Sequence, residues 1–184
     1  DLLRKEVEEK SSLGTKIKSI LDKGSFVSNE IINNLIEKII SNKKYANNLI
    51  FDGYPRNLEQ AYKLDNIMKK YNLLISCVLN LEVHQDIITK RILGRQICSN
   101  CGLTFNEFYN HVDKNEHKCD TKFLQKRSDD NADTIDNRFK TYIRETQPVL
   151  EYYEKQNLLK KVNGMNKIDD IYKEIRHIID SLKT

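Results

Sequence analysis

The sequence has 184 residues, which suits one ordinary domain or a core with insertions. Hydrophobic residues make up 39% of it, and no apolar run approaches the roughly 20 residues that a membrane-spanning helix needs, so a membrane protein is excluded. The net charge of +4 is too mild to demand a nucleic-acid surface, so we expect no nucleic-acid partner and only a local site for anions.

Helices dominate the prediction, because only two prolines and six glycines interrupt the chain. Apolar residues three and four positions apart predict one helix that ends at Gly24 and another that begins near Ser28. Asn57, with Gln60 three positions later, matches a capping box and predicts the start of the next helix. Further helices are predicted at 84–95, at 133–156 with a break at Pro148, and at 168–182.

Three short apolar segments between these helices are predicted to be strands. They cover residues 49–51, 74–81 and 158–162, and their nearly continuous apolar character is typical of a parallel sheet covered on both faces. Strand and helix therefore alternate, and the predicted fold class is α/β. Residues 97–130 contain few periodic apolar positions and are interpreted as an insertion with a small fold of its own.

The stretch IFDGYPRNLEQ, residues 50–60, contains the first candidate site. Ligands of an open α/β sheet bind beyond the carboxyl ends of its strands, and this turn is such an end. Asp52 could hold a hydrated metal ion there, Gly53 would let a ligand approach the backbone, and Arg56 offers a fork of donors to a phosphate. Asp52 and Arg56 could equally pair with each other in an ordinary turn, and the residues alone leave both interpretations open.

The cysteines form the second candidate site. Cys98, Cys101 and Cys119 lie close together in the sequence, and three thiols at such spacing favour a metal, or the remnant of a metal site, over disulfide bridges in a reducing compartment. Cys77 lies in an apolar segment and is interpreted as a core residue.

The stretch FDGYPRNLEQ closely resembles the signature of adenylate kinases, which are nucleoside monophosphate kinases. Segments such as RILGRQI and QKRSDDNADTIDNRF resemble the entry and exit of the family's long lid, and the resemblance covers almost the whole chain. It implies a three-layer α/β/α parallel sheet of the P-loop-kinase type whose N-terminal strands are missing here. It also implies a helical AMP-binding domain at 1–28, a core at 29–96 and 131–184, and a lid at 97–130.

The resemblance implies reversible phosphoryl transfer from Mg-ATP to AMP, which gives two ADP. A GTP:AMP phosphotransferase is a close alternative. Mg²⁺ would accompany the nucleotide, and Zn²⁺ could be present as a structural ion. Small nucleotides would be the partners of a monomer, in the cytoplasm or in mitochondria.

The resemblance also implies which residues bind AMP. Arg4 and Arg56 would bind its phosphate, and Gln60 would contact its base through the side-chain amide. The implied AMP site also contains Ser25, Phe26, Val27, Gly53, Tyr54, Arg127 and Arg138.

On the donor side, Arg91 would lie against the base and Arg95 would bind phosphate, while Thr104, Phe105 and Asn166 would complete the ATP site. Arg95, Arg127, Arg138 and Asp52 are the implied catalytic residues. Asp52 would orient magnesium through water, and Asp129 and Asp130 would orient arginines as the lid closes. Phosphoryl transfer needs positioning and positive charge more than covalent chemistry, and a convergent set of arginines would supply both.

Cys98, Cys101 and Cys119 resemble the zinc ligands found in the lids of part of the family. The position three after Cys119, where the family usually has Cys or Asp, is Lys122, so Asp120 or His117 would have to be the fourth ligand. A degenerate site with free thiols is the alternative.

The phosphate-binding motif G-x-x-x-x-G-K-[ST] is not found in this sequence, since none of its glycines is followed by lysine. We interpret the sequence as part of a longer enzyme rather than as a shortened family member, and we expect residues 1–184 alone to be inactive. An inactive nucleotide-binding protein and a zinc-ribbon nucleic-acid binder are further alternatives, although the latter leaves the IFDGYPR stretch unexplained.

Overall fold

The computed structural model describes residues 2–9, 11–22, 27–45, 49–113 and 117–182. The chain divides into two compact units. Unit 1 contains Leu3–Phe26 and His84–Phe139, and unit 2 contains Val27–Val83 and Lys140–Thr184. Among the described residues, no helix combines the length and the apolar character that crossing a membrane requires.

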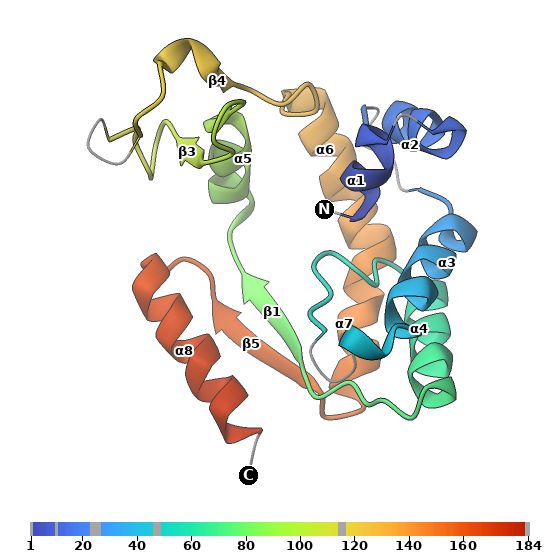
Figure 1. The fold of residues 1–184 in the computed structure, drawn as a ribbon. Coiled ribbons are helices and arrows are strands. Elements are labelled where there is room, and N and C mark those ends of the chain that lie inside the picture. The colour runs from blue at the N-terminus through green and yellow to red at the C-terminus, as the bar shows by residue number, and fades with distance from the viewer. Residues whose placement is uncertain (1, 10, 23–26, 46–48, 114–116, 183–184) are drawn as a thin grey trace. The chain divides into compact units, whose positions relative to one another are not determined.

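Unit 2 is built on two parallel strands, β1 (Val78–Glu82) and β5 (Leu159–Asn163). Helix α8 (Ile168–Ser181) packs on one face of this pair and α7 (Gln147–Glu154) on the other, as Figure 1 shows. Helix α4 (Leu58–Lys70) packs against α7, and α3 (Asn29–Ile40) packs against α4. This arrangement confirms the predicted α/β class with a parallel sheet.

Helix α4 contributes to both buried apolar clusters of unit 2. Its apolar residues Ala61, Leu64, Ile67 and Met68 recur at helical spacing, and all four are buried. Leu64 belongs to a cluster with Ile40 and Tyr54, while Ala61 lies in a second cluster with Val149 and Tyr153. The position of α4, and of the turn that precedes it, is therefore fixed by buried contacts along one face of the helix.

We expect Leu64→Ala to lower the free energy of unfolding of unit 2 by roughly 3 kcal/mol, because a side chain that is only 1% exposed would leave a cavity. Leu74→Ala is the matched control: Leu74 is 87% exposed, and its truncation should change the free energy by less than about 0.5 kcal/mol. Urea unfolding followed by circular dichroism measures both. Equal losses in the two variants would contradict the assignment of Leu64 to the core.

The strand predicted at residues 49–51 is wrong, because the structure has no strand there. Leu49 and Phe51 do pack against the cluster around Leu64, while Ile50 points out and is 93% exposed. The side chains of residues 49–51 thus alternate between buried and exposed, as they would in a strand. Their backbone does not pair with a strand, since β1 and β5 pair only with each other within the described residues. The second predicted strand is shorter than expected and begins at Val78.

The helix predicted at 133–156 is interrupted earlier than Pro148. Helix α6 (Ala132–Thr141) is followed by a π-helical turn, η3 (Tyr142–Thr146), and α7 begins at Gln147 with Pro148 in its first turn. Proline has no N–H, and its ring clashes with the carbonyl four residues before it. The backbone therefore changes its hydrogen-bond register before the proline, and Pro148 starts a new helix.

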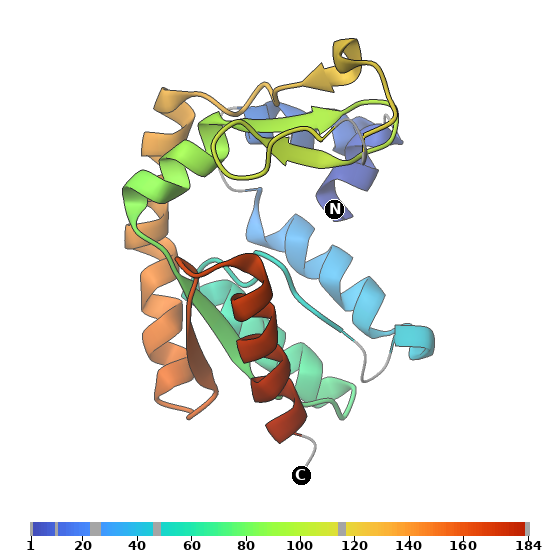
Figure 2. The same cartoon turned by 90° about the vertical axis from the view of Figure 1, so that its left-hand side faces the viewer.

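Unit 1 contains a small antiparallel sheet in the order β3–β2–β4, which Figure 2 shows. Its strands are β2 (Arg95–Cys98), β3 (Thr104–Asn106) and β4 (Leu124–Gln125). Unit 1 also contains the helices α1 (Leu2–Glu8), α2 (Ser12–Asp22) and α5 (Gln85–Leu93) and the 3₁₀ turn η2 (Thr121–Phe123). A second 3₁₀ turn, η1 (Lys43–Tyr45), lies in unit 2.

The helix predicted at 84–95 ends at Leu93, two residues early. Gly94 follows it, and its carbonyl accepts a hydrogen bond from the N–H of Glu107 at 2.8 Å. A Cβ atom at this position would lie 2.6 Å from the ring of Phe108 and 2.8 Å from Oδ1 of Asn106, so both side chains would have to shift. Arg91 therefore lies in a helix and Arg95 in a strand.

Candidate active site and metal centre

The turn between Phe51 and α4 holds Arg56 by both its side chain and its backbone. The Nε atom of Arg56 donates to the carbonyl of Gly53 at 2.7 Å, and the Arg56 carbonyl accepts from the hydroxyl of Thr146 at 2.8 Å. Gly53 has a φ of 69°, in the region that favours glycine, and a Cβ there would lie 2.9 Å from the Arg56 guanidinium. Asp52 is exposed beside them, with its carboxylate open to solvent.

Gln60 is the most constrained polar residue of this turn. Its backbone N–H donates to the Asn57 side chain at 2.9 Å, which confirms Asn57 as the predicted cap of α4. The Gln60 Oε1 atom accepts from the N–H of Arg56 at 2.7 Å rather than from the N–H of Asn57, which the capping box predicts. Its Nε2 atom donates to Asn29 at 2.8 Å, and the residue is fully buried.

Tyr54 anchors the same turn to α3. Its hydroxyl donates to the side chain of Asn33 at 2.8 Å, and both residues are buried. Burial raises the pKa of the Tyr54 hydroxyl to about 12, so the hydroxyl still donates this hydrogen bond in alkaline solution near pH 10.

Two of the predicted arginines pair with the acidic residues of unit 1. Arg95 makes a bidentate contact with Asp130, with Nε–Oδ2 at 2.9 Å and Nη2–Oδ1 at 2.5 Å, and the Asp130 side chain is fully buried. Arg138 forms an ion pair with Asp129. Burial raises the pKa of Asp129, but the hydrogen bond and charge of Arg138 outweigh it and hold the pKa below its usual range.

Arg91 and Arg127 lie in the same unit. The Arg91 guanidinium lies 5.6 Å from the ring centre of Tyr109, within the range of a cation–π contact, and its carbonyl accepts from Asn106. Arg127 is half-buried, and its carbonyl accepts from the N–H of Asp130 at 3.1 Å.

The residues predicted to contact the base of the donor nucleotide differ in exposure. Thr104 is exposed, whereas Phe105 is only 6% exposed and its ring packs against His117 with 4.9 Å between the ring centres. The Phe105 ring is therefore covered by its neighbours rather than open to solvent. Asn166 is exposed at the turn before α8.

The predicted residues are divided between the two units. Unit 2 brings together Asp52, Gly53, Tyr54, Arg56 and Gln60 within one turn, and it also contains Val27 and Asn166. Unit 1 contains Arg91, Arg95, Arg127 and Arg138. The side chain of Arg4 and the residues Ser25 and Phe26 lie outside the described part of the chain.

The cysteines of unit 1 form a cluster with a histidine. The ligand atoms of Cys98, Cys101, His117 and Cys119 all lie within 4.8 Å of one another. The sequence left the fourth ligand open between His117 and Asp120. The structure places His117 in the cluster. The Asp120 side chain instead accepts from the N–H of Lys122 at 2.9 Å.

This cluster fits a tetrahedral zinc ion. Three thiols and an imidazole are a donor set that zinc prefers. His117 is 5% exposed, and its Nε2 atom has no hydrogen-bond partner among the described residues, as expected for a nitrogen that serves as a metal ligand. Burial raises the pKa of the Cys98 thiol, but His117 and the backbone of Cys101 and Asn100 outweigh it and lower the pKa to about 6. Asn100 also donates to the sulfur of Cys119 at 3.3 Å.

Sequence reasoning missed Asn29, Glu59 and Thr146, which hold Gln60 and Arg56 in place. Asn29 lies about thirty positions before its partners in the sequence, and no local motif connects it to them.

Comparisons with known proteins identify the family of this chain. The family model described as "Adenylate kinase" matches residues 1–158. An adenylate kinase of Pelagibacter ubique (strain HTCC1062) is 41% identical over 179 residues, which is 97% of this chain and 84% of the relative. Adenylate kinases of Listeria innocua and of Staphylococcus aureus (strain Mu50) are 34% and 35% identical, over 98% and 99% of this chain and 85% of each relative. The chain belongs to the adenylate kinase family.

Proposed function

We propose that this protein is an adenylate kinase, which transfers a phosphoryl group reversibly between Mg-ATP and AMP and yields two ADP. The observation that carries the proposal is the turn before α4, where Arg56 and Gln60 are held by directed hydrogen bonds. An arginine fork suits a phosphate, and a side-chain amide suits the edge of a base. The two groups lie four residues apart in one short turn, so a single nucleotide could contact both.

On the acceptor side, Arg56 would bind the AMP phosphate together with Arg4, and Gln60 would contact the base. Val27 is buried near the start of α3, where its backbone, with that of Ser25 and Phe26, would line the same pocket. The carbonyl of Gly53 keeps the Arg56 side chain folded over the turn. That contact lowers the entropy that the arginine would lose on binding.

On the donor side, Arg91, Arg95, Thr104, Phe105 and Asn166 would bind the triphosphate nucleotide. Arg95, Arg127 and Arg138 would surround the transferring group and stabilise the charge on its equatorial oxygens. The pairing of Arg95 with Asp130 and of Arg138 with Asp129 supports this assignment, because the carboxylates fix the directions in which the guanidinium groups point. Residues 1–28 and 97–130 would close over the substrates and exclude water.

Magnesium would enter with the nucleotide. Asp52 fits this role, because its carboxylate is exposed and offers the oxygen ligands that Mg²⁺ or its bound waters prefer. Magnesium, when bound, would neutralise phosphate charge, while Asp52 would orient its waters. A zinc ion held by Cys98, Cys101, His117 and Cys119 would be purely structural.

We also propose a monomer in the cytoplasm. All four cysteines of the chain are unbridged, as a reducing compartment would keep them. Sedimentation equilibrium would test the monomer.

Nucleotide binding and activity test the proposal separately. We expect isothermal titration of residues 1–184 to detect AMP binding, with CMP bound at least about tenfold more weakly, because the amide of Gln60 would discriminate the base once the groups that bury it move aside. We expect no phosphoryl transfer from Mg-ATP by these residues alone, because none of their glycines is followed by the lysine of a phosphate-binding loop. Equal affinity for AMP and CMP would contradict the acceptor assignment, and measurable transfer would contradict the expected inactivity.

A further inference from the structure

The peptide groups on the two sides of the Arg56 Cα atom are each held by a hydrogen bond. The N–H of Arg56 donates to Oε1 of Gln60 at 2.7 Å, and the carbonyl of Arg56 accepts from the hydroxyl of Thr146 at 2.8 Å. The first bond holds the plane of the peptide before Cα, and the second holds the plane of the peptide after it. Together they set the direction in which the Arg56 side chain leaves the backbone.

The partners of Arg56 come from two different parts of unit 2. Gln60 lies four residues after Arg56, and the carbonyl of Gly53, which accepts from Nε of Arg56, lies three residues before it. These two bonds hold Arg56 within its own turn. Thr146 lies 90 positions away in η3, so its hydroxyl ties the turn to a separate element of the same unit.

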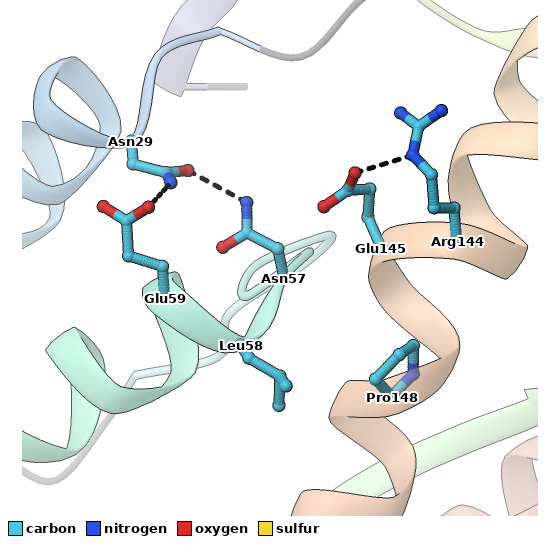
Figure 3. Close-up of a pocket in the computed structure, with 7 residues that line it drawn as sticks. All are labelled: Asn29, Asn57, Leu58, Glu59, Arg144, Glu145 and Pro148. Atoms are coloured by element: carbon cyan, nitrogen blue, oxygen red, sulfur yellow. Dashed lines mark hydrogen bonds and ion pairs between the residues drawn. The ribbon is translucent and has the colours of Figure 1, made fainter.

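A cavity of about 270 Å³ lies between the start of α4 and the segment formed by η3 and the first turn of α7. Figure 3 shows the residues of its two walls, which are Asn57, Leu58 and Glu59 on one and Arg144, Glu145 and Pro148 on the other. Side-chain packing joins α4 to α7 elsewhere, around Ala61 and Val149. Arg56 and Thr146 are the chain neighbours of Asn57 and Glu145, so their hydrogen bond connects the two walls where space, rather than packed side chains, separates them.

The hydroxyl of Thr146 does not follow the usual pattern of a helical hydroxyl. Thr15, Ser19 and Ser181 each donate to a carbonyl three or four residues earlier in the chain, which is the common local partner. At η3 the N–H of Gln147 donates to the carbonyl of Tyr142, five residues earlier, and such single π-helical turns are frequent at functional sites. The bond from Thr146 to Arg56 is therefore a specific connection between two segments that starts from an irregular turn.

We propose that Thr146 is a positioning residue that sets the affinity of the acceptor site for the phosphate of its nucleotide. The inference rests on the proposed function, in which Arg56 binds the AMP phosphate. Without the hydroxyl, the peptide after Arg56 gains freedom to rotate. A smaller fraction of the molecules then directs Arg56 toward the phosphate, and the apparent affinity falls by that fraction. Arg56 is exposed, so water replaces the lost partner of its carbonyl and the stability of the fold changes little.

The experiment compares AMP with adenosine, which has the same base and sugar but no phosphate, by nuclear magnetic resonance titration of residues 1–184. Thr146→Val keeps the shape of the side chain and removes the hydroxyl. We expect the dissociation constant of AMP to rise about fivefold, the effect of one neutral hydrogen bond. That of adenosine should change less than about twofold. An unchanged AMP dissociation constant, or an equal weakening of AMP and adenosine, would overturn the proposal.

Two further variants test whether the hydrogen bond is the cause. Thr146→Ser keeps the hydroxyl, so the AMP dissociation constant should stay within about twofold of that of the unaltered protein. A loss as large as that of Thr146→Val would show that the hydroxyl is not responsible. Ser181→Ala is the matched control, because it removes a hydroxyl of the same unit that donates to the carbonyl of Ile178 in its own helix. A fivefold loss of AMP affinity in this control would also count against the proposal.

The substitution Arg56→Ala separates this inference from the proposed function. If it leaves the AMP dissociation constant unchanged, Arg56 does not bind the phosphate, and the acceptor assignment fails together with the inference. If it weakens AMP binding while Thr146→Val does not, only the inference fails. Thermal unfolding of Thr146→Val should occur at the temperature of the unaltered protein. A lower temperature together with equal losses of AMP and adenosine would assign Thr146 a structural role instead.

Discussion

Substitution Cys98→Ser is expected to abolish zinc binding and to unfold the small sheet of unit 1. Structural zinc ions in small peptides contribute apparent free energies of about 10–16 kcal/mol, more than the roughly 2–5 kcal/mol of a truncated core side chain. Cys98 is fully buried at the end of β2, so a serine there would lose the thiolate and leave a polar hydroxyl inside. Metal analysis should find one zinc ion per chain in the unaltered protein, and calorimetry should show a lower unfolding temperature in the variant.

Cys77→Ser is the matched control. Cys77 is half-buried in unit 2, outside the cluster, and its substitution should leave the zinc content unchanged. A zinc chelator added to the unaltered protein should reproduce the effect of Cys98→Ser. Protein purified without chelator that contains no zinc, or a serine variant that retains it, would show that the cluster is not a zinc site.

Substitution Arg56→Ala is expected to weaken AMP binding about 100-fold, because it removes charge-assisted hydrogen bonds to the phosphate that contribute roughly 1.5–3 kcal/mol. Arg56→Lys keeps the charge but lacks the planar fork, so it should recover only part of the affinity. Isothermal titration measures both variants. Thermal unfolding of the same samples is needed because Arg56 also donates to Gly53, and that bond is lost with the side chain.

Arg144→Ala is the control for Arg56. Arg144 belongs to the same unit, but its side chain is 71% exposed and pairs with Glu145. Its truncation removes the same charge and should change the AMP dissociation constant less than about twofold. If Arg56→Ala has an effect as small as that of Arg144→Ala, Arg56 does not bind the phosphate.

Local rules predicted the start of α4 well, because the Asn57 cap and the apolar spacing from Ala61 to Met68 act within one helix. They were wrong at residues 49–51, because a strand depends on a neighbour that may be far away in the sequence. They placed the interruption of the 133–156 helix too late, because the clash caused by Pro148 acts on the preceding turn.

The metal cluster was predictable in part. The spacing of Cys98, Cys101 and Cys119 indicated a metal site, but His117 and Asp120 both lie within two positions of Cys119, and the sequence does not distinguish them. Packing distinguishes them, since His117 is buried against Phe105 while Asp120 caps the turn that follows it. The network of Asn29 with Glu59 and Gln60 could not be predicted, because it depends on how α3 packs against α4.

If Arg95 binds a nucleotide phosphate as we propose, its contact with Asp130 has a consequence for product release. Two of the five N–H groups of the guanidinium point at a carboxylate, so part of its positive charge is already compensated. A phosphate at Arg95 would meet a guanidinium whose direction is fixed by Asp130. Its electrostatic attraction would be weaker than that of an arginine without a carboxylate partner. Such an arrangement favours orientation over tight retention, and a product nucleotide held in this way could leave quickly enough for the next cycle.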